Sequence, residues 1–61
     1  GEALTALSVS MGIQPEDRGH FKKTMHENFN TIFSREDVTA GEVMNNIRSV
    51  MSSDEKLATY S

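Results

Sequence analysis

The stretch TAGEVMNNIRSVM, residues 39–51, carries the signals of a complete amphipathic helix. Thr39 and Glu42 have the spacing of a capping box, in which each side chain accepts a hydrogen bond from a backbone N–H of the first turn. Val38 and Val43 occupy the two positions of a hydrophobic staple across this cap. The sequence therefore predicts a helix that begins within a residue or two of Thr39.

The apolar side chains of this stretch gather on one side of the predicted helix. At about 100° per residue they span an arc of about 120°. They are Val43, Met44, Ile47, Val50 and Met51. Ile47 lies near the middle of the arc and is predicted to be a core residue. Met44 and Met51 lie at one edge, where we expect the monomer to leave them uncovered.

Residues 2–11 predict an N-terminal helix. Its shared apolar face is formed by Leu4, Leu7 and Met11. Ala3 and Ala6 flank that face and would let a neighbouring helix come close. Val9 points elsewhere, and it marks either a second contact surface or an isolated exposed residue. Gly12 has the position and type of a left-handed residue that closes a helix.

A second helix is predicted to open at Pro15, because proline is favoured at the first helical position. The helix continues to Phe33 and carries the longest apolar stripe of the chain, within an arc of about 120°. The stripe consists of Phe21, Met25, Phe29, Ile32 and Phe33. Phe29 lies near the middle of this arc, so we expect it in the core.

The C-terminal residues predict a short last helix. Ser52 and Glu55 have the capping-box spacing, and Leu57 and Tyr60 then share a face. The pattern as a whole predicts a single all-α domain of residues 1–61, a small bundle of three to four short amphipathic helices.

The composition excludes several classes of protein. The 61 residues contain no cysteine, so neither a disulfide nor a thiolate metal site is available. Nine acidic and six basic residues give a net charge of −3, which argues against a general nucleic-acid or anionic-membrane surface. No apolar run approaches the about 20 residues of a membrane-spanning helix. We expect a cytoplasmic protein that does not bind membranes.

The sequence offers no catalytic or metal-binding motif. His20 and His26 are six residues apart, about 240° around a helix, so they cannot share a metal ion. We expect both to be solvated and without function. The HExxH motif, the EF-hand loop, the glycine-rich phosphate loop and the GxSxG motif are absent. The sequence therefore predicts no enzyme, no cofactor and no small-molecule substrate.

The basic residues Arg18 and Lys22 project into the same arc as the aromatic stripe. Long cationic side chains in that position usually lay their stems along the core and keep the charge in water. A second interpretation places the two cations at the edge of an interface, where they would meet acidic groups of a partner. A third interpretation is that they contact phosphate groups.

Two functions are compatible with this fold. A 61-residue chain without disulfide or metal has a thin core, which favours burial against a second copy. We therefore expect a non-catalytic protein-interaction or regulatory module that self-associates. The residues predicted to form its interface are Val9, Met44, Met51, Arg18 and Lys22. The alternative is a small DNA-binding regulator that uses helix 39–51.

The DNA-binding alternative depends on the polar side of that helix. The side chains it would present to DNA are Asn45, Asn46, Arg48 and Ser49. Asparagine and arginine both read base edges. Glu42 in the first turn, and Glu36 and Asp37 before it, would however face the phosphates. This alternative is therefore the less favoured one.

Overall fold

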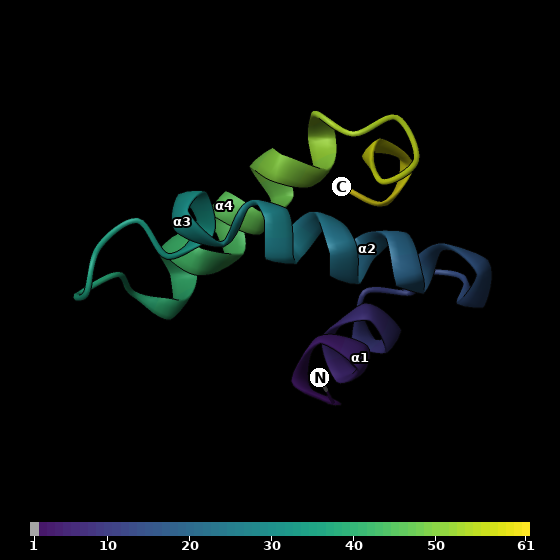
Figure 1. Cartoon of the computed structure of the whole chain (residues 1–61), viewed down its shortest axis with the longest axis horizontal. Coiled ribbons are helices and arrows are strands. Elements are labelled where there is room, and N and C mark those ends of the chain that lie inside the picture. The colour runs from purple at the N-terminus through teal and green to yellow at the C-terminus, as the bar shows by residue number, and fades with distance from the viewer. Residues whose placement is uncertain (1) are drawn as a thin grey trace.

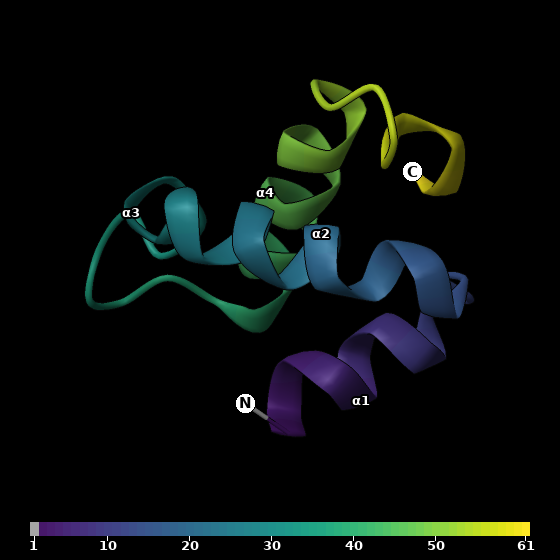
Figure 2. The same cartoon turned by 45° about the vertical axis from the view of Figure 1, so that its right-hand side comes forward.

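Five helical segments make up the chain in the computed structural model, which describes residues 2–61 (Figure 1). They are α1 (Glu2–Ser10), α2 (Pro15–Glu27), α3 (Phe29–Ile32), α4 (Ala40–Ser52) and the short 3-10 helix η1 (Ala58–Tyr60). No strand occurs among the described residues, so the predicted all-α fold is confirmed. The helix α2 lies centrally, with α1 packed along one side of it and α4 crossing it on another (Figure 2).

The start of α4 agrees with the sequence prediction. Thr39 is the N-cap, with an extended backbone, and its hydroxyl accepts a hydrogen bond from the N–H of Glu42 at 3.2 Å. The Glu42 carboxylate in turn accepts from the N–H of Thr39 at 3.2 Å. The capping box is therefore complete, and Val38 and Val43 are half-buried beside it.

The end of α1 is closed by a Schellman motif. The N–H of Gly12 donates to the carbonyl of Val9, and the N–H of Ile13 donates to the carbonyl of Ser8, both at 3.0 Å. Gly12 has a φ of 75°, a conformation that costs glycine little because it has no Cβ. The motif turns the chain so that Ile13 enters the core.

The predicted continuous helix from Pro15 to Phe33 is wrong, because it is interrupted at Asn28. The backbone there leaves the helical region at φ −110° and ψ 20°. The Asn28 amide donates to the carbonyl of Thr24 at 2.9 Å, and the backbone N–H of Asn28 donates to the same carbonyl at 3.1 Å. An asparagine side chain that forms a hydrogen bond with a nearby backbone carbonyl competes with the regular hydrogen bonds of a helix. The apolar stripe is thereby split between α2 and α3.

The split corrects the prediction that Phe29 is a core residue. Phe29 is 56% exposed and Phe33 is 47% exposed, whereas Ile32 is buried. The turn at Asn28 changes the direction of the chain, so Ile32 takes the inward position that a straight helix would have given to Phe29.

The predicted capping box at Ser52 is also wrong. The helix α4 includes Ser52, and Asp54 organises the following turn by accepting hydrogen bonds from the N–H groups of Lys56 and Leu57 at 2.9 and 3.1 Å. An aspartate that bonds the backbone two residues ahead is typical of a tight turn. The turn buries Leu57 completely.

Tyr60 anchors the last residues to α2. Its hydroxyl donates to the carboxylate of Asp17 at 2.7 Å and accepts from the N–H of Gln14 at 3.2 Å. The hydrogen bond to Asp17 raises the pKa of the Tyr60 phenol above its ordinary value, because the phenol must keep its proton in order to donate it.

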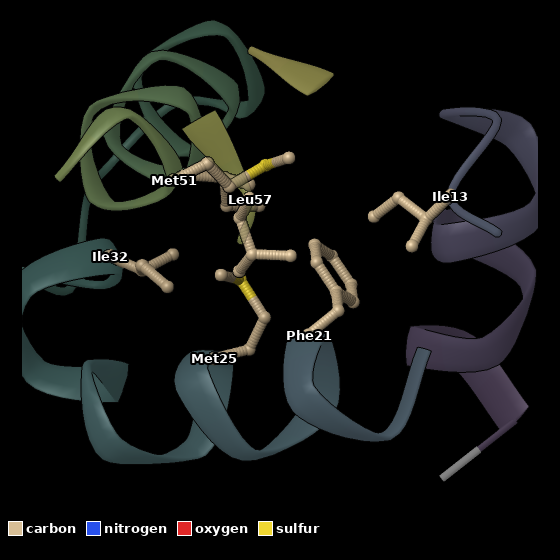
Figure 3. Close-up of a cluster of buried hydrophobic side chains, with 7 residues drawn as sticks. Ile13, Phe21, Met25, Ile32, Met51 and Leu57 are labelled. Carbon is tan, nitrogen blue, oxygen red and sulfur yellow. The ribbon is translucent and has the colours of Figure 1, made fainter. Parts of the chain in front are cut away.

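The core is formed by side chains from α2, α3 and α4 and from the turns that follow α1 and α4 (Figure 3). Its buried apolar members are Ile13, Phe21, Met25, Ile32, Ile47, Met51 and Leu57. The prediction that Ile47 is a core residue is confirmed. The prediction that Met51 stays uncovered is wrong, because Met51 is fully buried beside Leu57 and Phe21 (Figure 3).

Candidate protein-interaction site

An apolar groove lies between α1 and α4, with α2 and α3 beneath it. Its volume is about 410 Å³. The residues that line it are Ala3, Leu4 and Leu7 of α1, Met25, His26, Phe29 and Ile32 of α2 and α3, Phe33, and Val43, Met44 and Ile47 of α4. Among these described residues, His26 is the one that can carry a charge. The groove is therefore suited to an apolar segment and poorly suited to a polar ligand.

An aromatic ridge, Phe29 and Phe33, forms one wall of the groove. The two ring centroids are 4.9 Å apart and the ring planes are tilted by 31°. Both rings are about half exposed, although phenylalanine is among the residues most often buried. A contiguous exposed apolar surface of this kind is typical of an interaction site.

The structure separates the predicted interface residues. Met44 lines the groove. Val9 is 53% exposed, on the part of α1 that does not line it. Met51 is in the core and is not available to a partner. The sequence pattern placed both methionines at the interface. It was wrong for Met51, which packs with Leu57 in a turn organised by Asp54 instead of the predicted capped helix.

The basic residues Arg18 and Lys22 do not line the groove. The Arg18 Nε donates to the carbonyl of Ile13 at 3.1 Å, and this bond holds the corner between α1 and α2. Lys22 is half-buried on α2. An interface role for these two cations stays a prediction.

A second hollow, also of about 410 Å³, has a polar lining. It is formed by His20, Thr24, Glu27, Asn28, Thr31, Ser49, Val50, Ser53 and Asp54. The His20 Nε2 lies 2.7 Å from an Asp54 carboxylate oxygen, and this contact joins α2 to the turn after α4. His20 is therefore only partly solvated, with 30% of its side chain exposed, whereas His26 is exposed as expected.

The hydrogen bond from His20 holds the pKa of Asp54 below its ordinary value. Partial burial opposes this shift, and the N–H groups of Leu57 and Lys56 add to it. His20 and Asp54 are 34 residues apart in the chain, so no local sequence motif predicts that they form a pair. Its evident effect is to hold the C-terminal turn against α2.

Two further features bear on what the surface can bind. Within residues 2–61, no set of three or more His, Asp or Glu side chains converges as metal coordination requires. None of the helices there combines the length and apolar character needed to cross a bilayer.

The polar side of α4 is partly occupied. The Asn46 amide donates to the carbonyl of Ile32 at 3.0 Å, so it braces α4 against α3. Asn45, Arg48 and Ser49 are exposed. At the start of the helix, Glu42 accepts a hydrogen bond from Arg35 at 2.6 Å. The Arg35 hydrogen bond lowers the pKa of Glu42, so this carboxylate stays charged beside the face that DNA would have to approach.

Comparison with known proteins assigns the chain to a family. Residues 1–61 match the model of the family described as "Protein of unknown function (DUF3015)", and the chain belongs to that family. No curated protein matches the chain. No solved structure matches it either.

Proposed function

We propose that this chain is a non-catalytic protein-interaction module that self-associates through the face containing the apolar groove. The observation that carries the proposal is the groove itself, an open hollow lined by apolar side chains and bordered by two half-exposed phenylalanine rings. Covering this surface is favourable, because apolar area left in contact with water costs free energy in proportion to its size.

The size of the chain adds to the argument. Seven buried apolar side chains are a small core for 61 residues without a disulfide. Fully burying one phenylalanine stabilises a protein by about 1.5–3 kcal/mol relative to leaving it exposed. Covering Phe29 and Phe33 in an assembly would therefore add a sizeable fraction of the folding free energy of so small a domain.

Sedimentation velocity over a concentration series tests the proposal. We expect the sedimentation coefficient to rise with protein concentration, and the melting temperature to rise with it by mass action. Met44→Lys should abolish both effects, because it places a charge in the apolar lining. A monomer at every concentration up to high micromolar would contradict self-association.

Asn45→Lys is the matched control for Met44→Lys. Asn45 is the next residue of α4, it is exposed, and the substitution adds the same charge on the other side of the helix. We expect it to leave the association unchanged. The same two variants in a mobility-shift assay with duplex DNA at low salt address the alternative function. Retardation of DNA by the parent, strengthened by Asn45→Lys and unaffected by Met44→Lys, would favour DNA binding through α4 instead.

A further inference from the structure

The helix α1 lacks a charged face. From Ala3 to Met11 the sequence contains no charged residue, so Glu2 is the one charge of the helix. A helix that is apolar or small on every side is typically buried on every side. Of its nine residues, however, only Ser8 is buried here. One side of α1 packs against α2 and the other side, including Val9, faces solvent.

Small residues lie along the exposed side of α1 and at the start of α4, beside the groove. On α1, the exposed residues Ala3, Ala6 and Ser10 follow one another at helical spacings of three and four. On α4, Gly41 lies one turn before Met44, and no other segment of the described chain comes within 4 Å of the position that a Cβ would occupy. Small residues let helix backbones pack at short distances, which a larger side chain would prevent.

We propose, building on the self-association proposed above, that the helix α1 of a second copy occupies the apolar groove. Each copy inserts the outer side of its α1 into the groove of the other, so the interface is isologous. This arrangement covers in one step the two surfaces that the monomer leaves exposed, the uncharged helix and the apolar groove. Of the three described helices of nine or more residues, α1 alone has an outer side without charged residues, since α2 carries lysines and acids and α4 carries Arg48.

The charges of the two copies are compatible with this occupant. Each chain has a net charge of −3, so two copies repel one another at long range. The inserted residues of α1 and the groove lining contain no carboxylate, so the repelling charges stay at the periphery and in water. Added salt screens this repulsion, and the association should therefore strengthen or stay constant as salt rises.

The area available fits a weak dimer. A helix of nine residues is about 14 Å long, so each insertion is short. Two such short insertions place the assembly among small interfaces, and those under about 1,200 Å² in total are typically weak or transient. The dimer should therefore dissociate on dilution.

Val9→Lys tests the inserted helix, because Val9 is exposed in the monomer and does not line the groove. In sedimentation velocity we expect the dimer dissociation constant to rise by about tenfold or more, since the lysine would have to enter an apolar site. Circular dichroism should show an unchanged helix content. Thr59→Lys, at an exposed position of η1, is the control and should leave the dissociation constant unchanged.

A cross-linking experiment tests the geometry separately, on a chain that has no cysteine of its own. An equimolar mixture of Ala6→Cys and Val43→Cys chains should give a covalent heterodimer under mild oxidation, because insertion places Ala6 against the groove that Val43 lines. A mixture of Ala6→Cys with Glu36→Cys, in the loop before α4, should not. If Met44→Lys dissociates the dimer while Val9→Lys and the mixture of Ala6→Cys with Val43→Cys behave like controls, self-association through the groove stands and insertion of α1 is overturned. A parent chain that stays monomeric overturns both proposals.

Discussion

Phe21 and Phe29 belong to one apolar stripe in the sequence, but they differ in burial in the structure. Phe21 is fully buried, whereas Phe29 is 56% exposed. The two residues are separated by the turn at Asn28, which divides the stripe between α2 and α3. A side chain's position in a periodic pattern thus predicts burial only as far as the helix itself continues.

The neighbours of the two residues explain the difference further. Phe21 is covered by Ile13 from the turn after α1 and by Leu57 from the C-terminal turn (Figure 3). No comparable segment covers Phe29, which borders the apolar groove instead. The half of the stripe that contains Phe21 is covered by other segments of the same chain, and the half that contains Phe29 is left exposed to a partner.

The largest effect on stability is expected from a substitution in the buried half of the stripe. Phe21→Ala should lower the free energy of unfolding by about 3–5 kcal/mol, because it leaves a cavity in the centre of a small core. Urea denaturation followed by circular dichroism measures this loss. A variant with the parent's midpoint would show that Phe21 does not organise the core.

The stability of the C-terminal turn that covers Phe21 is expected to depend on pH, because Asp54 holds this turn against α2. The pKa of Asp54 is lowered in the folded chain by its hydrogen bond to His20, so the stabilising contribution is present above the ordinary pKa of an aspartate. It is lost as the pH falls through the lower folded-state value. Asp54→Asn should therefore destabilise the chain near pH 7, and the difference from the parent should shrink towards pH 3. A difference that is constant over this range would contradict the assignment.

A smaller effect concerns the wall of the groove opposite α1. Thr39→Ala removes the side-chain cap that fixes the start of α4, whose residues Val43 and Met44 line the groove. We expect a loss of about 1 kcal/mol in urea denaturation. Thr39→Ser keeps the hydroxyl and serves as the control, which should restore most of the loss.

The smallest effect on unfolding is expected at the exposed half of the stripe. Phe29→Ala should change the stability of the monomer by about 0.5 kcal/mol or less, since a half-exposed ring loses little on truncation. The same variant should weaken self-association clearly in sedimentation velocity. A loss of stability as large as that of Phe21→Ala in dilute solution would mean that the two halves are equivalent after all.

Features set by a few neighbouring residues could be predicted from the sequence. The capping box at Thr39 and the helix end at Gly12 depend on contacts within one or two turns, and both were found where the sequence placed them. Ile47 was predicted correctly because the helix around it is unbroken.

Features set by distant contacts or by competing local choices could not be predicted. At Asn28 the amide bonds the preceding turn in place of a continuous helix, and nothing in the periodicity of the stripe marks this choice. The burial of Met51 depends on Leu57, whose turn is organised by Asp54 rather than by Ser52. Of the candidate site, the sequence identified Met44, but the groove also needs α1 and the displaced Phe29 ring.

The contact between Tyr60 and Asp17 gives this protein a built-in optical reporter. Tyr60 is the one tyrosine of the chain and there is no tryptophan, so this side chain dominates the intrinsic fluorescence and the three phenylalanines add only weakly to it. A phenol hydrogen-bonded to a carboxylate emits weakly, because the carboxylate accepts its proton in the excited state. Emission should therefore rise when the C-terminal turn leaves α2, and this rise separates detachment of that turn from melting of the helices.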